Sequence, residues 1–334
     1  DSCPPALLVS FQSDRLFSGW NPPPQVIRAL VAHRDARGPN HEKTRQVARS
    51  RQMTVERKGW RPRLLTLWLP LGIALFFALF PFYWMAITSL KTNQELYSRK
   101  VMPLIVHHPT LKHYVDLITE TSFLEWTWNT FLVAVVSTAI SLILGAMLAY
   151  PLARLRFAGA ALVSFAVAAT YLVPQPLLFV PLADLINRLG LGDTLTSVML
   201  TYPTLLIPFC AWLLMGYFRT VPIELEDAAR IDGASRLQTL VKIVLPLCGP
   251  GFISAGIFAF TLAQNEFLYA LIFLTKTEVR TVPVGAIAEL VRGDVFYWGQ
   301  LMAAALLGSI PVAIIYSFFV EHYVAGLTAG SVKG

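Results

Sequence analysis

Six long stretches of the sequence contain no charged residue, and they constrain the fold more than any other feature. A helix rises about 1.5 Å per residue, so about 20 apolar residues cross the hydrocarbon core of a bilayer. The stretches are continuously apolar rather than alternating, which favours helices over the strands of a barrel. No other charge-free stretch exceeds 12 residues. The sequence therefore predicts an all-α membrane protein with six transmembrane helices, in residues 64–90, 126–153, 157–183, 194–218, 243–265 and 295–320.

The overall composition supports a membrane protein. Charged residues make up 14% of the 334 and hydrophobic residues 55%, whereas soluble domains average about 25% charged residues. The net charge of +7 lies mostly in residues 1–52, which contribute +4. Because no basic face with readout elements appears in the rest, nucleic-acid binding is excluded.

An even number of spans places both termini on one side of the membrane. After Met53, the terminal side carries 11 Lys and Arg residues and the opposite side 8. Arg154 and Arg156 fill the short turn between the second and third spans, where the positive-inside rule is most informative. We therefore predict that both termini are cytoplasmic.

Residues 1–63 are predicted to be a disordered or weakly ordered cytoplasmic leader. Residues 1–52 contain six prolines and no apolar stretch long enough to span a bilayer. One hypothesis is that Met53 is the biological start, so that 1–52 lies upstream of it. The alternative is a genuine cytoplasmic tail.

The longest predicted cytoplasmic connection, the 219–245 loop, joins the fourth and fifth spans. Pro222 suits the first turn of a helix, and Glu224, Glu226 and Asp227 lie where the helix dipole favours negative charge. Gly233 supplies a left-handed stop. Considered by its local physics alone, the loop could equally be an ordinary connector.

A second short helix is expected after Gly233. Its apolar residues recur with the period of one buried helix face, and Pro246 then opens the fifth span. These apolar residues are Leu237, Leu240, Val241 and Val244.

The order and spacing of residues in this loop resemble the EAA loop of ABC-importer permeases. In that motif E-A-A-x-x-x-G is followed nine residues later by I-x-L-P. Here Asp227 replaces the motif glutamate, and Glu226 stands beside it. The remaining matching residues are Ala228, Ala229, Asp232, Gly233, Ala234, Ile243, Leu245 and Pro246.

The resemblance extends over about 64–334 and is closest to the maltose-type carbohydrate branch of that family. Segments 81–84 and 149–154 resemble its first helix and its turn between helices 2 and 3. Asn265-Glu266-Phe267 resembles its W-N-E-F motif, with Gln264 in place of the tryptophan. Residues 326–334, GLTAGSVKG, are the most specific match.

The resemblance implies a six-helix type I importer permease bundle over 64–320, whose 219–245 loop forms a coupling helix seated in a cytoplasmic ATPase. It implies a bacterial or archaeal inner membrane, a second permease as heterodimer partner, two ATPase subunits and an extracytoplasmic sugar-binding protein. The C-terminal tail, 321–334, would reach between the ATPase subunits through Gly326, Gly330, Lys333 and Gly334.

The chain itself is predicted to be non-catalytic. It contains no G-x-x-x-x-G-K-[ST] phosphate loop, so ATP and magnesium are expected in the partner ATPase and no cofactor in this chain. Its six histidines and three cysteines form no metal-binding motif, so no metal is expected.

Glu266 is the only carboxylate deep within a predicted span, and intramembrane charge is expensive. Together with Asn265 it has either a structural pairing role or a place on the translocation path. A proton-coupled secondary transporter with Glu266 as carrier is one alternative function, and an intramembrane enzyme is another. A third alternative is an importer permease for a non-sugar polar solute such as glycerol-phosphate.

Overall fold

The computed structural model describes residues 64–98, 101–155 and 157–329. The chain divides into two compact units, Asp1–Ala78 and Leu79–Gly334. In the first unit the described elements are the π-helix η1 (Leu64–Trp68) and the beginning of α4 (Leu69–Leu90). The predicted leader, including Met53, lies outside the described residues.

The second unit is almost entirely helical. After the end of α4 it contains α5 (Asn93–Leu96), α6 (Lys112–Glu120), α7 (Phe123–Arg154), α8 (Ala160–Ala169), η2 (Thr170–Leu172), α9 (Gln175–Arg188), α10 (Leu195–Thr201), α11 (Pro203–Phe218), α12 (Ile223–Ile231), α13 (Arg236–Thr239), η3 (Leu240–Val244), α14 (Leu245–Leu247), α15 (Gly249–Gln264), α16 (Leu268–Phe273), η4 (Thr277–Val279), α17 (Val282–Leu290), an antiparallel hairpin of β1 (Val291–Arg292) and β2 (Val295–Phe296), and α18 (Trp298–Ala329).

The described residues contain four helices long and apolar enough to cross a membrane, namely Thr66–Leu90, Phe123–Arg154, Leu195–Phe218 and Trp298–Val320. A fifth candidate is the pair Arg236–Leu247 and Gly249–Asn265, which is bent by 82°. These helices confirm an all-α membrane fold.

The predicted span 157–183 differs from expectation because it is not one helix. It is divided into α8, η2 and α9. Val173 is extended, with ψ of 118°, immediately before Pro174. Proline lacks a backbone N–H and disfavours helical backbone in the residue before it, so the helix ends there and α9 begins anew.

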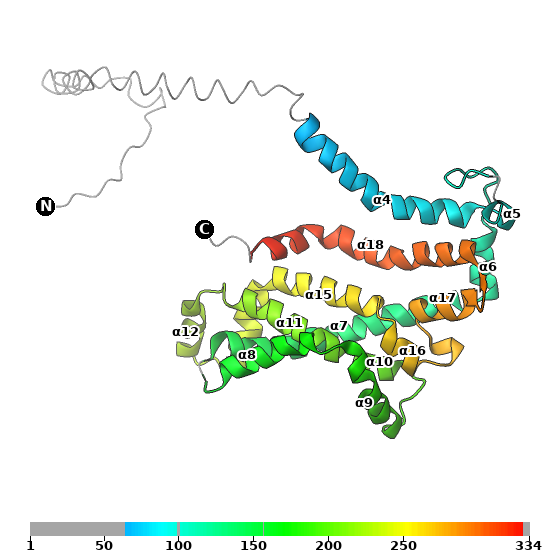
Figure 1. Cartoon of the computed structure of the whole chain (residues 1–334). Coiled ribbons are helices and arrows are strands. Elements are labelled where there is room, and N and C mark those ends of the chain that lie inside the picture. The colour runs from blue at the N-terminus through cyan, green and yellow to red at the C-terminus, as the bar shows by residue number, and fades with distance from the viewer. Residues whose placement is uncertain (1–63, 99–100, 156, 330–334) are drawn as a thin grey trace, which may run out of the picture. The chain divides into compact units, whose positions relative to one another are not determined.

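Helix α7 is the centre of the bundle, where it packs along α11 and α15, and α18 packs on α15 (Figure 1). Gly145 lets α7 approach α11 closely, because an added Cβ would lie 2.8 Å from Cys210 Cβ of α11. Small residues at such contacts let transmembrane helices pack by dispersion. The bundle therefore holds α7 rigidly along much of its length.

Trp126, near the start of α7, organises the end of the bundle opposite α12. Its side chain is fully buried, and its indole Nε1 donates a 3.0 Å hydrogen bond to the Thr277 carbonyl. Gly285 of α17 lies directly against the indole ring, where an added Cβ would overlap it. This contact ties α17 to α7.

Candidate functional site

The first helix of the 219–245 loop, α12, ends as the sequence predicts. Gly233 has a left-handed φ of +86°. The Ala234 N–H donates to the Ala229 carbonyl at 2.9 Å, and the Gly233 N–H donates to the Arg230 carbonyl at 3.1 Å. This pair of bonds is a Schellman motif, which satisfies the last carbonyls of a helix.

The second helix of the loop begins with a capping box. Ser235 Oγ accepts from the Gln238 N–H, and Gln238 Oε1 accepts from the Ser235 N–H at 2.8 Å. The chain then continues as η3, a π-helical turn. The Schellman motif ends α12, and the capping box begins the helix by which the chain returns to the bundle.

The predicted buried face of the second helix is only half correct. Leu240 and Val244 are buried, whereas Leu237 and Val241 are exposed. The prediction assumed a regular α-helical period. Leu237 lies in α13 (Arg236–Thr239), and the wider π-helical turn η3 begins only at Leu240, so the assumed period does not run through all four residues.

Glu226 faces the bundle and is held on both oxygens. Its Oε1 lies 2.6 Å from Arg154 Nε, and its Oε2 accepts a 2.8 Å hydrogen bond from the Tyr150 hydroxyl. Only 7% of the Glu226 side chain and 9% of the Arg154 side chain are exposed. Arg154 also donates from Nη2 to the Val221 carbonyl just before α12. A buried ion pair therefore joins the loop to the end of α7.

Asp227, at the position of the motif glutamate, faces the opposite way. It is exposed and pairs with the exposed Arg230 one turn later at 3.3 Å. Ala228 is exposed and Ala229 buried, while Asp232 is exposed and Ala234 half-buried. The motif residues thus divide between an outward and an inward face of α12.

Ile243, Leu245 and Pro246 lie where the loop re-enters the bundle. Ile243 and Leu245 are half-buried, and Pro246 is exposed in α14. The chain bends by 82° between α14 and α15. These residues therefore form the corner of the loop, away from the outward face of α12.

The sequence alone does not predict that Tyr150 and Arg154 are the partners of Glu226. Segment 149–154 is predicted only as part of the family resemblance. Arg154 is predicted only as a positive charge that places its turn on the cytoplasmic side. Tyr150 and Glu226 are separated by 76 positions, and no local pattern joins them. Their i, i+4 spacing at the end of a long helix is the one signal that could have suggested a shared partner.

Asn265 and Glu266 lie at the break between α15 and α16. Asn265 Nδ2 donates to the Thr261 carbonyl at 2.8 Å. The Glu266 carboxylate accepts from the N–H groups of Tyr269 and Ala270 at 2.9 and 3.2 Å, so it caps α16. This geometry supports the structural interpretation of Glu266.

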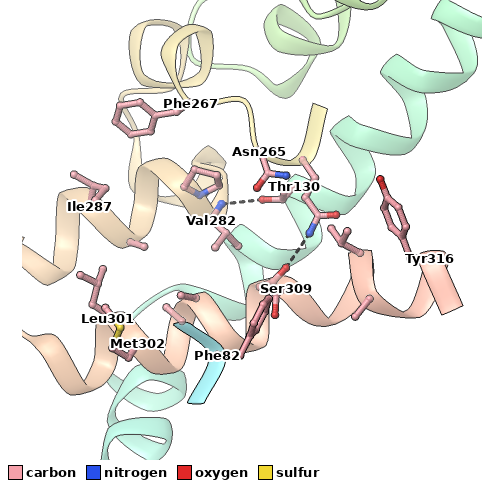
Figure 2. A pocket seen from close by; sticks show the side chains of 18 residues that line it. Phe82, Thr130, Asn265, Phe267, Val282, Ile287, Leu301, Met302, Ser309 and Tyr316 are labelled. Carbon is pink, nitrogen blue, oxygen red and sulfur yellow. Dashed lines mark hydrogen bonds between the residues drawn. The ribbon is translucent and has the colours of Figure 1, made fainter. Parts of the chain in front are cut away.

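Asn265 also lines a cavity of about 900 Å³ enclosed by residues of α15, α17 and α18. Figure 2 shows Thr130, Asn265 and Ser309 among apolar side chains such as Met302 and Phe267. Gln264, which replaces the motif tryptophan, donates to the Gly308 carbonyl at 2.9 Å. The glutamine therefore links α15 to α18 by a hydrogen bond.

Of the residues predicted in the C-terminal tail, Gly326 lies in α18, which continues to Ala329. Gly330, Lys333 and Gly334 lie outside the described residues. Within the described ranges, no group of three or more His, Cys, Asp and Glu residues is arranged to hold a metal ion.

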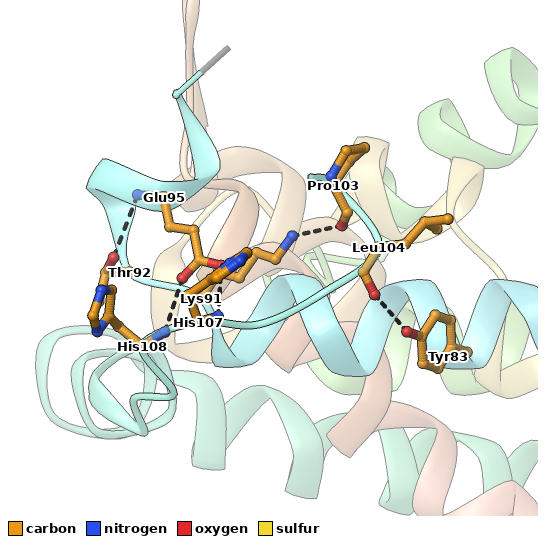
Figure 3. A network of polar contacts seen from close by, with 8 residues as sticks. All are labelled: Tyr83, Lys91, Thr92, Glu95, Pro103, Leu104, His107 and His108. Carbon is orange, nitrogen blue, oxygen red and sulfur yellow. Dashed lines mark hydrogen bonds and ion pairs between the residues drawn. The ribbon is translucent and has the colours of Figure 1, made fainter. Parts of the chain in front are cut away.

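A second polar cluster lies at the opposite end of the bundle from α12, between α5 and α6 (Figure 3). The buried Glu95 carboxylate accepts from the backbone N–H groups of His107 and His108 at 2.9 and 3.3 Å. Lys91 donates to the Pro103 carbonyl at 2.5 Å, and Tyr83 to the Leu104 carbonyl at 2.5 Å. These bonds fold the connection onto the end of α4.

The Glu95 cluster predicts a pH dependence. Burial alone raises the pKa of Glu95, but hydrogen bonds from His107 and His108 outweigh it and lower the pKa below 4.5. A lowered pKa stabilises the folded connection above pH 4.5, and the stabilisation is lost as pH falls through the lowered value. We expect the His107 and His108 amides to keep their hydrogen-exchange protection from pH 7 to 4.5 and lose it below, after correction for intrinsic rates.

Glu95→Gln is the control, because its uncharged amide does not titrate. Its one amide oxygen can still accept a hydrogen bond, so protection should be lower than in the wild type at pH 7 and should not fall further below pH 4.5. Loss of protection in the wild type between pH 7 and 6, or an equal loss in Glu95→Gln below pH 4.5, would contradict a dependence on the Glu95 carboxylate.

More than half of the chain matches a known protein family. Residues 141–328 match the family described as binding-protein-dependent transport system inner membrane component. The chain belongs to this family. It is 40% identical over 264 residues to the sulfoquinovosyl glycerol transport system permease protein SmoH of Agrobacterium fabrum, a match that covers 79% of this chain and 92% of the relative.

A second relative is the trehalose/maltose transport system permease protein MalG of Thermococcus litoralis. It is 35% identical over 259 residues, covering 77% of this chain and 92% of the relative. A solved chain of a bacterial ABC transporter involved in the import of alginate matches the fold with a TM-score of 0.67 at 21% identity, covering 80% of this chain and 98% of that chain.

Membership of the family confirms the resemblance found in the sequence. The chain is a multi-pass inner-membrane permease component and not an enzyme. The interpretations as a proton-coupled secondary transporter or an intramembrane enzyme are therefore set aside.

Proposed function

We propose that this chain is a permease subunit of an ATP-driven importer for a carbohydrate, and that α12 is its coupling helix. The observation that carries the coupling role is the division of α12 into two faces. Glu226 and Ala229 face the bundle, whereas the apolar side chains of Ile223, Leu225 and Ile231 are exposed. Large apolar side chains exposed in this way are candidates for contact with another protein.

The partner of this surface is a cytoplasmic ATPase. Asp227 and Arg230 lie on this exposed face of α12. The small side chain of Ala228 leaves room there for another surface to approach. ATP and magnesium bind in that ATPase, and this chain holds no cofactor. Both termini and α12 then lie on the cytoplasmic side, and the C-terminal tail extends toward the same partner.

The remaining partners are a second permease, a second ATPase subunit and an extracytoplasmic binding protein. The names of two relatives support a carbohydrate substrate, because those proteins transport sulfoquinovosyl glycerol and trehalose or maltose. A binding protein delivers the sugar to the side of the membrane opposite α12.

Reconstitution tests the function. The chain is co-purified with its permease, ATPase and binding-protein partners and placed in proteoliposomes. We expect uptake of labelled mono- or disaccharides that requires ATP and is abolished by vanadate. Uptake driven by a pH gradient without ATP would overturn the proposal, and uptake of glycerol-phosphate but no sugar would replace the substrate class.

A further inference from the structure

Helix α12 has few attachments to the bundle. Of its nine residues, Glu226 and Ala229 alone are buried. Ala229 contributes one methyl group, so Glu226 supplies the principal side-chain attachment. Apart from the backbone at its two ends, a load applied to the outward face of α12 can therefore enter the bundle through the Glu226 carboxylate.

The groups that hold this carboxylate belong to a single helix. Tyr150 and Arg154 stand one turn apart at the end of α7 and bind the two oxygens of Glu226 at 2.8 and 2.6 Å. Arg154 also donates a hydrogen bond to the Val221 carbonyl. It therefore holds both Glu226 of α12 and the segment that leads into α12. The carboxylate is thus held by the charge of Arg154 on one oxygen and by a hydrogen bond from Tyr150 on the other.

The receiving helix is one of two 32-residue helices among the described residues and is the more buried of the two. Helix α7 runs 32 residues from Phe123 to Arg154 and packs along α11 and α15. Its far end carries the buried Trp126 packed against α17. Displacement of the Arg154 end is thus passed to contacts at both ends of the bundle.

Breaking this pair is costly, because removal of one partner leaves the other charge buried without compensation. We infer that Arg154 is a positioning residue that transmits movement of α12 to α7 through its buried pair with Glu226. This inference rests on the proposed function, since it assigns the path by which the ATPase moves the permease.

The test replaces both charges at once, which avoids an unpaired buried ion. In the double variant Arg154→Met with Glu226→Gln, the glutamine amide oxygen still accepts from the Tyr150 hydroxyl. The matched control removes the exposed pair of α9, Asp184 and Arg188, whose side chains are 62% and 76% exposed and 2.9 Å apart. That control is Asp184→Asn with Arg188→Met.

The readout is the number of sugar molecules taken up per ATP hydrolysed in proteoliposomes, together with the yield of assembled transporter. We expect the Arg154/Glu226 variant to assemble with its ATPase and to lose about tenfold in uptake per ATP, and the Asp184/Arg188 control to keep the wild-type ratio. A purely structural pair would lower the yield and leave the ratio unchanged, which would overturn the inference. An unchanged ratio at wild-type yield would overturn it as well.

The conservative variant Arg154→Lys provides a second test in case the double variant does not assemble. Lysine keeps the charge beside Glu226 but lacks the second donor for the Val221 carbonyl, so we expect about a threefold loss in uptake per ATP. A wild-type ratio in Arg154→Lys would overturn the inference. Absence of ATP-dependent uptake by the wild-type assembly would instead overturn the proposed function.

Discussion

Replacing Gly233 with valine is expected to lower ATP-driven uptake about five- to thirtyfold while the protein still inserts into the membrane. Gly233 has a φ of +86°, and left-handed backbone costs an L-residue about 1–2 kcal/mol. That energy corresponds to a factor of about 5–30 in the ratio of native to non-native loop, and we expect uptake to follow this ratio. No atom lies within 4 Å of the added Cβ, so the effect is one of backbone strain alone.

The expected mechanism is loss of the Schellman motif at the end of α12. Without it the carbonyls of Ala229 and Arg230 lose their hydrogen bonds, and α12 frays toward the surface proposed to bind the ATPase. The measurement compares co-purification of the ATPase and uptake by the variant and the wild type, at equal amounts of protein in the membrane.

Gly233→Asn is the matched control, because asparagine tolerates left-handed backbone better than other non-glycine residues. It should retain uptake within about twofold of the wild type. Equal, undiminished uptake by the valine and asparagine variants would count against a role for the left-handed turn. Loss of the valine variant from the membrane would show that the turn is needed for folding rather than for coupling.

Replacing Gly285 with alanine is expected to destabilise the bundle by about 1–3 kcal/mol, the usual cost of overpacking a filled core. The added Cβ overlaps the indole of the fully buried Trp126. The hydrogen bond from its Nε1 to the Thr277 carbonyl at 3.0 Å restrains the ring from moving aside. Thermal unfolding in detergent, followed by tryptophan fluorescence, measures the change.

The same substitution at Gly256 provides the control. There the added Cβ would meet Leu142 Cδ1 at 3.4 Å, an ordinary van der Waals contact. Alanine is favoured over glycine in a helix interior by about 1 kcal/mol, so Gly256→Ala should leave the midpoint unchanged or raise it. A similar midpoint in both variants would refute the overpacking at Trp126.

Several features of the fold could be predicted because their causes are local. Charge-free stretches determine which segments enter a bilayer, and five of the six appear as long or bent apolar helices. The exception, 157–183, contains Pro174 and Pro176, and a hydropathy pattern does not show whether neighbouring helices compensate a proline. The structure divides that stretch into α8, η2 and α9.

The sequence predicts where the 219–245 loop lies in the chain and how its first helix ends. It does not predict which side chains of that helix face the bundle. Sequence spacing identified the 219–245 loop and the left-handed Gly233. It did not show that Asp227 faces outward while Glu226 is buried, since adjacent residues on one helix differ in direction by about 100° and the packing determines which one points inward. The buried face assigned to Leu237 and Val241 was wrong, since both side chains are exposed and the helix changes from α13 to the π-helical η3 between them.

By itself the sequence determined the class of protein, the apolar segments and the chemistry of the turns, because hydropathy, proline and glycine act within a few residues of one chain segment. The tertiary structure alone decided which charge is buried. The scarce charges, 14% of the chain, are mostly placed outside the apolar stretches, and only the packing of α12 against α7 selects Glu226 and Arg154 from among them as a buried pair. Desolvation and ion pairing depend on neighbours in space, and 76 positions of sequence separate Glu226 from Tyr150.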